Sequence, residues 1–146
     1  MKQLQIKLLR PNAKKPARET AGSVGYDLAA CIDDMVILEP GETRMVGSGI
    51  AIALEQGYAA FVYARSGLGI KSGIIPANCV GVIDSDYRGE VMIALKNTSN
   101  APFLVNDGDR IAQMVIVKCE LPELCVSEQL DDTTRAAAGF GSTGVG

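Results

Sequence analysis

The chain has 146 residues, of which 47% are hydrophobic and 21% are charged, and its formal net charge is −3. This composition is typical of one folded, soluble domain of ordinary size and excludes a disordered chain. The acidic balance also argues against sequence-independent binding to long nucleic acid, which needs a basic face, but it allows a small anionic ligand.

The chain contains no histidine, so the most common general base and the most common zinc ligand are both missing. Its four cysteines, at positions 31, 79, 119 and 125, form no Cys-x-x-Cys pair. We expect them to be buried, reduced thiols of a cytoplasmic protein, with a metal site or disulfides as the alternatives. No signal peptide is expected, and no run of about 18 apolar residues predicts a membrane span.

A two-residue apolar period predicts strands over residues 46–54 and 91–95, short apolar runs of strand length predict two more over 58–63 and 114–117, and one short helix fits 68–72. Turn-forming residues lie between them at 40–41, 56–57, 97–100 and 107–108. Many short strands at this spacing predict an all-β barrel or sandwich built as one domain. The small polar residues from 131 onward predict a tail outside the core.

Two matches to common motifs fail because of their context. Residues 139–144 (GFGSTG) match the Gly-x-Gly-x-x-Gly of dinucleotide-binding folds, but only two residues follow them, so no helix can form after the loop. Residues 64–68 (ARSGL) present Ser66 between small neighbours, but a chain without histidine cannot build a Ser-His-Asp triad. Rossmann and serine-hydrolase chemistry are therefore excluded.

Four further segments gather chemically useful side chains. ARSGLG (64–69) joins an arginine to glycines that let backbone amides approach an anion, and the alternative is a strand end with a glycine turn. GVIDSDYRGE (81–90) holds two aspartates, a tyrosine and an arginine, and the alternative is an ordinary hairpin turn. GDRIAQ (108–113) and SVGYDL (23–28) add Arg110, Gln113 and Asp27. Each segment is weak evidence in isolation.

Taken in order, AGSVGYDL, ARSGLG, GVIDSDYRGE, GDRIAQ and the terminal GFGSTG resemble the five motifs of the dUTP pyrophosphatase (dUTPase) family, over residues 21–144. The resemblance implies a jelly-roll-like β-barrel of the β-clip type over residues 1–130, and a flexible glycine-rich arm over 131–146 that acts as a lid. It also implies a homotrimer whose active sites lie at subunit interfaces. Neither polymeric nucleic acid nor a membrane is expected as a partner.

The activity that the resemblance implies is hydrolysis of dUTP to dUMP and pyrophosphate with Mg²⁺. This reaction would limit uracil in DNA and supply dUMP for thymidylate synthesis. Two other functions remain as alternatives: a dCTP deaminase-like enzyme of the same fold, and a non-catalytic module that senses nucleotides or binds a protein.

The resemblance assigns Asp84 as the base that activates a water for attack on the α-phosphorus. Tyr87 would pack under the deoxyribose and reject a 2′-hydroxyl, and Asn78 would read uracil. Asp27 would lie near metal-bound waters, with Mg²⁺ held mainly by substrate phosphates. Further substrate-binding residues are Gly81, Val82, Ile83, Arg65, Ser66, Gly67, Gln113, Arg135, Phe140, Gly141, Ser142 and Thr143. For Arg110, support of the trimer or of the fold is the alternative to a part in the site.

The fifth motif departs from the family pattern, since Ala136 and Ala138 stand where glycine is usual. If the closed lid needs a positive φ there, each alanine would add about 1–2 kcal/mol to closure. If ordinary dihedrals suffice, alanine would instead lower the entropy that is lost on ordering.

Overall fold

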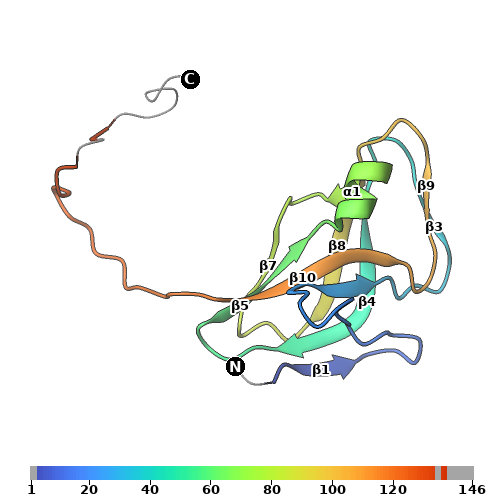
Figure 1. The fold of residues 1–146 in the computed structure, drawn as a ribbon, viewed down its shortest axis with the longest axis horizontal. Coiled ribbons are helices and arrows are strands. Elements are labelled where there is room, and N and C mark those ends of the chain that lie inside the picture. The colour runs from blue at the N-terminus through green and yellow to red at the C-terminus, as the bar shows by residue number, and fades with distance from the viewer. Residues whose placement is uncertain (1–2, 134–135, 138–146) are drawn as a thin grey trace.

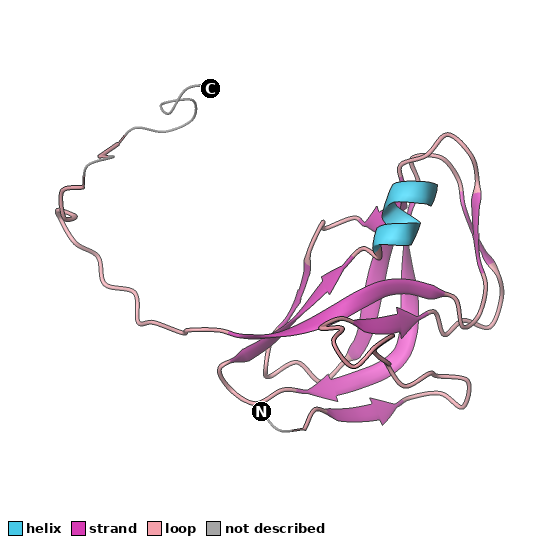
Figure 2. Cartoon of the chain, in the orientation of Figure 1, coloured by secondary structure: helices cyan, strands magenta, loops and turns pink. Residues whose placement is uncertain are grey.

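The computed structural model describes residues 3–133 and 136–137, and these residues form antiparallel sheets with one short helix (Figures 1 and 2). The elements in chain order are β1 (Gln5–Leu8), β2 (Tyr26–Ala29), β3 (Val36–Leu38), β4 (Thr43–Ala53), β5 (Tyr58–Tyr63), α1 (Ser66–Ser72), β6 (Ile74–Pro76), β7 (Gly81–Ile83), β8 (Glu90–Asn97), β9 (Phe103–Val105) and β10 (Arg110–Lys118). The all-β, jelly-roll-like fold that the sequence predicts is confirmed.

Two four-stranded sheets enclose the core. One has the strand order β1-β4-β8-β6, the other has β2-β10-β5-β7, and β3 pairs with β9 in a small third sheet. Alternate residues of β8 point inward, so that Val91, Ile93 and Leu95 are each at most 2% exposed. They join Val62 and Met114 of the second sheet in one apolar cluster. Burial of both inner faces therefore holds the two sheets together.

The longer predicted strands and the helix are present, with shifted ends: β4 begins at Thr43, β8 extends to Asn97 and α1 begins at Ser66. Strand β4 also contains an irregularity in its pairing with β8, between Gly47 and Ala51. Gly49 lies inside it with φ +67, a conformation that glycine adopts without strain. The side chain of Glu90 in β8 enters this irregularity.

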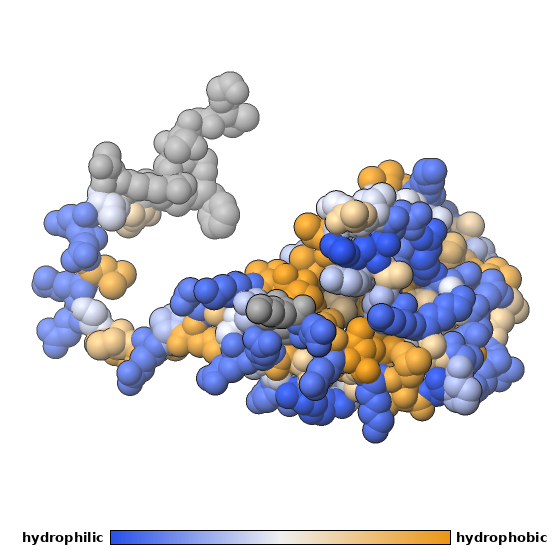
Figure 3. Space-filling view, turned by 60° about the horizontal axis from the view of Figure 1, so that its bottom comes forward, coloured by the Kyte–Doolittle hydropathy of each residue, from blue (hydrophilic) through white to orange (hydrophobic). Residues whose placement is uncertain are grey.

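After β10, residues 119–133 contain no strand and extend away from the sheets (Figure 1). Leu124 is 91% exposed and Val126 is fully exposed. Figure 3 shows apolar surface both on this segment and on the body of the molecule. Within the described ranges the only helix has seven residues, and it is too short to cross a bilayer.

Candidate active site

A cleft of about 530 Å³ opens where β2, β10 and the start of α1 meet. Its walls come from three of the chemically rich segments of the sequence. They are formed by Glu19, Ser23, Val24, Gly25, Asp27, Arg65, Ser66, Gly67, Arg110 and Gln113. The structure thus brings together the first-, second- and fourth-motif residues that the sequence predicts, including Arg110.

Strand pairing explains how distant segments meet at this cleft. Gln113 of β10 lies opposite Asp27 of β2 on one side and Tyr63 of β5 on the other. Its side-chain amide donates a hydrogen bond of 2.9 Å to the carbonyl of Ala64. Arg65 then continues in extended conformation (φ −77, ψ 133) and precedes α1, so Ser66 and Gly67 form the first turn of the helix. The register of β10 therefore places the arginine directly above Asp27.

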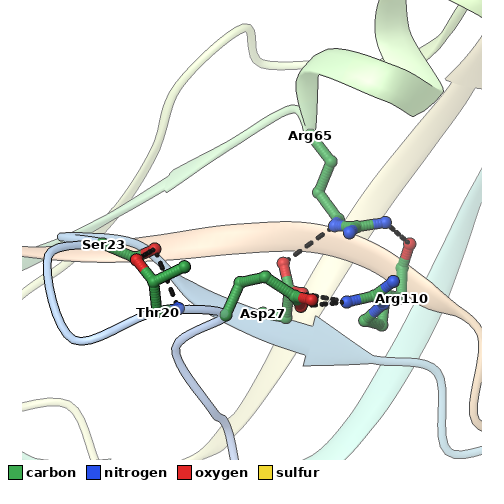
Figure 4. Close-up of polar contacts among 6 residues, drawn as sticks. Thr20, Ser23, Asp27, Arg65 and Arg110 are labelled. Atoms are coloured by element: carbon green, nitrogen blue, oxygen red, sulfur yellow. Dashed lines mark hydrogen bonds and ion pairs between the residues drawn. The ribbon is translucent and has the colours of Figure 1, made fainter.

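Asp27 joins two arginines across the floor of the cleft (Figure 4). Its Oδ1 accepts a hydrogen bond of 2.8 Å from Arg65 Nε, and its Oδ2 accepts one of 2.9 Å from Arg110 Nη1. The same Arg110 nitrogen lies 2.7 Å from Oε2 of Glu19. The hydrogen bond to Glu19 and the charge of Asp27 raise the pKa of Arg110 above its ordinary value. Both guanidiniums remain cationic, and planar guanidiniums suit phosphate oxygens.

The second predicted group lies at the other edge of the same sheet. In the order β2-β10-β5-β7, strand β7 is the outermost strand opposite β2. It carries Gly81, Val82 and Ile83, and Asp84 and Tyr87 follow it. Within the described residues, the lining of the cleft includes neither these residues nor Asn78. One chain therefore does not bring the predicted base to the predicted phosphate site.

The hairpin that carries the predicted base is closed by its own hydrogen bonds. Arg88 Nη1 donates to the carbonyls of Ser85 and Tyr87, at 2.7 and 2.8 Å. The amide of Tyr87 donates to the carbonyl of Asp84 at 3.2 Å. Asp84 and Tyr87 are both exposed. The turn thus leaves the carboxylate and the aromatic ring on the protein surface, where another molecule can contact them.

The loop before β7 is tight. The amide of Cys79 donates to the carbonyl of Pro76 at 3.0 Å, and Cys79 has φ +61, which is unusual for a side chain larger than hydrogen. Asn78 beside it is exposed. A Cβ at Gly81 would lie 3.3 Å from Nδ2 of Asn78, so the absence of a side chain there leaves space for the amide.

Glu19 also lines this site, although the sequence did not predict it. The amide of Asp27 donates to the carbonyl of Ala17 at 2.8 Å, and this bridge brings the neighbouring Glu19 to Arg110. A single exposed acid ahead of a motif gives no signal in the sequence. The residues of the predicted lid, Arg135, Ala138, Phe140, Gly141, Ser142 and Thr143, lie outside the described residues.

The carboxylates of this cleft bear on the Mg²⁺ that the sequence predicts. Among the described residues, no three His, Cys, Asp or Glu side chains form a group that could hold a metal ion. The cleft does offer carboxylate oxygens on Asp27 and Glu19, beside two arginines. This set fits Mg²⁺ that keeps several waters and takes its other ligands from a phosphate chain.

The chain is similar to known proteins over nearly its whole length. The dUTPase family model matches residues 11–144. The deoxyuridine 5′-triphosphate nucleotidohydrolase of Desulfitobacterium hafniense (strain DSM 10664 / DCB-2) is 50% identical over 133 residues, which are 90% of this chain and 88% of the relative. The enzyme of that name from Janthinobacterium sp. (strain Marseille) is 45% identical over 147 residues, with 99% of each chain covered.

Among solved structures, the Staphylococcus bacteriophage 80alpha dUTPase with dUPNHPP superposes with a TM-score of 0.91 at 29% identity. The match covers 99% of this chain and 100% of the phage protein. Fold, motif order and overall identity thus agree over nearly the whole length, and the chain belongs to the dUTPase family.

Proposed function

We propose that this protein hydrolyses dUTP to dUMP and pyrophosphate, and so limits uracil in DNA and supplies dUMP for thymidylate synthesis. The observation that supports this most directly is the pair of guanidiniums of Arg65 and Arg110, which Asp27 holds together in the cleft. A triphosphate carries charge at several oxygens, and two fixed arginines bind such a chain well. Ser66, Gly67 and Gln113 line the same cleft and would complete the phosphate contacts.

In the proposed reaction, Asp84 takes a proton from a water while the water oxygen forms a bond to the α-phosphorus. The bond between that phosphorus and the oxygen bridging to the β-phosphorus breaks, and pyrophosphate leaves. Arg65 would hold the phosphate chain in line for this attack. When bound, Mg²⁺ would neutralise charge on the phosphates, with Asp27 near its waters.

The hairpin around β7 would select the nucleotide. Uracil offers an acceptor at O4 and a donor at N3, and the Asn78 amide with the backbone of residues 81–83 can match both. Cytosine reverses this pattern and would leave buried polar groups unpaired. The ring of Tyr87 would pack against the sugar and reject a 2′-hydroxyl.

We propose a homotrimer, because the hairpin and the phosphate cleft lie at opposite edges of one sheet and must come from different chains to meet. Cyclic symmetry would repeat this pairing three times. Apolar side chains stand exposed near both edges, with Val24 73% and Val82 58% exposed. The arm over 131–146 would deliver Arg135, Phe140, Gly141, Ser142 and Thr143 as a lid. The four free thiols fit a cytoplasmic location.

The test is release of pyrophosphate from dUTP with Mg²⁺, compared with dCTP, dTTP and UTP, for the wild type and Asp84→Asn. We expect activity on dUTP that chelation of Mg²⁺ abolishes, and a loss of about 10²–10⁴-fold in the variant. Sizing chromatography should give a trimer for both proteins. Ammonia release from dCTP would identify a deaminase instead. Tight dUTP binding without turnover would identify a sensing module.

A further inference from the structure

We infer that Gly89 and Glu90 hold the Tyr87 ring in one position, and that this support determines how strictly the enzyme rejects ribonucleotides. The inference rests on the proposed function, in which Tyr87 contacts the sugar. Tyr87 is 45% exposed, so packing on the body of the protein leaves much of its ring uncovered. Its ring contacts Gly89 and Glu90, which follow it in the same turn.

Gly89 supplies the first contact. A Cβ placed on this residue would lie 2.6 Å from Cζ of Tyr87, 3.0 Å from Cε2, and closer still to the hydroxyl oxygen. The distances to Cζ and to the hydroxyl oxygen are shorter than real Cβ contacts, and the distance to Cε2 is at their lower limit. The φ angle of Gly89 is not positive, so its backbone would accept alanine. The absence of a side chain at this position is needed for the tyrosine ring, which folds back over the glycine.

Glu90 supplies the second contact through its backbone, since its carbonyl accepts a hydrogen bond of 3.0 Å from the Tyr87 hydroxyl. The side chain of the same residue anchors Glu90 to β4. Oε1 of Glu90 accepts a hydrogen bond of 2.8 Å from the amide of Gly49, inside the irregular part of β4. A Cβ at Gly47 would lie 2.5 Å from that oxygen, so the glycine leaves the space that the carboxylate occupies.

The neighbouring residue of β8 is tied to the same part of β4. Ser48 Oγ donates a hydrogen bond of 2.6 Å to the carbonyl of Val91, and both residues are buried. The buried strand β4 thus anchors Glu90, and Glu90 holds the hydroxyl at the tip of the tyrosine ring. A methyl group at position 89 would displace the ring from this support, because the tip of an exposed ring moves more easily than the strand.

The decisive variant is Gly89→Ala, assayed for kcat/KM on dUTP and on UTP. We expect the ratio of UTP to dUTP to rise about tenfold, the low end of what one methylene-sized group discriminates in a pocket. The dUTP kcat should fall far less than in Asp84→Asn. Gly22→Ala is the matched control, since no atom lies within 4 Å of a Cβ there and its φ is not positive. It should discriminate as the wild type does.

A double-mutant cycle shows whether Gly89 acts through the tyrosine. In a Tyr87→Ala background, Gly89→Ala should change the ratio no further. An equal effect in that background, or wild-type discrimination in Gly89→Ala, overturns the inference. Should Gly89→Ala fail to fold, Tyr87→Phe removes the hydrogen bond to Glu90 and should also raise the ratio, and unchanged discrimination there overturns it. A wild type without dUTP hydrolysis contradicts the proposed function instead.

Discussion

Asp27 holds Arg65 by an ion pair of 2.8 Å in which both side chains are largely shielded, at 19% and 27% exposed. The other oxygen of Asp27 pairs with Arg110, so a single carboxylate separates two guanidiniums. Such an acid orients the arginines before a ligand arrives. The free-energy cost of placing two cations together is therefore part of folding and not of ligand binding. In the proposed function, a polyphosphate would exchange with part of this network without rebuilding the cleft.

Asp27→Asn should therefore lower stability in the absence of ligand. The asparagine amide leaves two guanidiniums close together without a negative charge between them. Because this network is partly exposed, we expect the free energy of unfolding to fall by about 1 kcal/mol. Denaturant unfolding measures the effect. Inorganic pyrophosphate should restore part of the loss, because it supplies the missing charge. Glu19→Gln is the control, since Glu19 is 72% exposed and should change stability by a few tenths of a kcal/mol at most. Equal stability of Asp27→Asn and the wild type would contradict this account.

Cysteine labelling can locate the nucleotide base. Burial raises the pKa of the Cys31 thiol, so at any given pH it holds less reactive thiolate than an exposed cysteine. Iodoacetamide near pH 8 should therefore modify the exposed Cys79 and Cys125 first, as peptide mass spectrometry can show. Cys79 adjoins Asn78, the predicted uracil-reading residue. At about ten times its Kd, dUMP should slow labelling of Cys79 by about tenfold.

Cys125 is the internal control for that experiment, since it lies on the extended segment after β10. Its labelling rate should not respond to dUMP. Equal protection of Cys79 and Cys125 would show a general change in the protein, and protection of neither would place the base elsewhere.

The way the free energy of unfolding changes at low pH should depend on Glu42. The backbone amide of Glu39 and the side chain of Arg44 donate to its carboxylate, at 2.8 and 2.5 Å, and these contacts lower its pKa below the ordinary value. A lowered folded-state pKa adds stability above the unfolded pKa of about 4.3, and this stability is lost as the pH falls through the folded value.

Glu42→Gln should thus be less stable than the wild type at pH 7, and the difference should vanish in acid below the folded pKa. Chemical denaturation across this range measures it. Glu123→Gln, on the exposed segment after β10, should follow the wild type at every pH. A difference between Glu42→Gln and the wild type that persists unchanged in strong acid would show that the lowered pKa of Glu42 is not its cause.

The sequence predicts elements that are long enough to show a period. Strands β4, β5, β8 and β10 have six to eleven residues and show either alternation, as β8 does, or a long apolar run, whereas β3, β6, β7 and β9 have only three residues each. Three residues cannot establish a two-residue period, and only pairing with neighbours defines these short strands.

The same distinction applies to the site. The motifs predicted that Asp27, Arg65 and Gln113 would act together, and the cleft brings them together. The ion pair of Glu19 with Arg110 depends on the bridge between Ala17 and Asp27, which is a long-range contact without a local sequence pattern. The distance of the Asp84 hairpin from the cleft likewise follows from strand order, which the motifs do not encode.

The alanines of the fifth motif can be tested at Ala136, which adopts φ +44 and whose amide donates to the carbonyl of Thr133 at 3.0 Å. An alanine in this left-handed region carries a cost of about 1–2 kcal/mol, which glycine avoids, while glycine loses more entropy on ordering. If lid closure fixes this turn in an arm that samples other conformations when open, Ala136→Gly should lower the KM for dUTP by about threefold, the net of these two effects.

Ala137→Gly is the matched control, because its φ is not among the positive values. Glycine there relieves no strain and only increases the freedom of the open arm, so the KM should rise. Steady-state kinetics on dUTP compares the two variants under identical conditions. Opposite shifts would show that the positive φ of Ala136 is retained when the lid closes, whereas shifts in the same direction would mean that the closed lid uses a different turn.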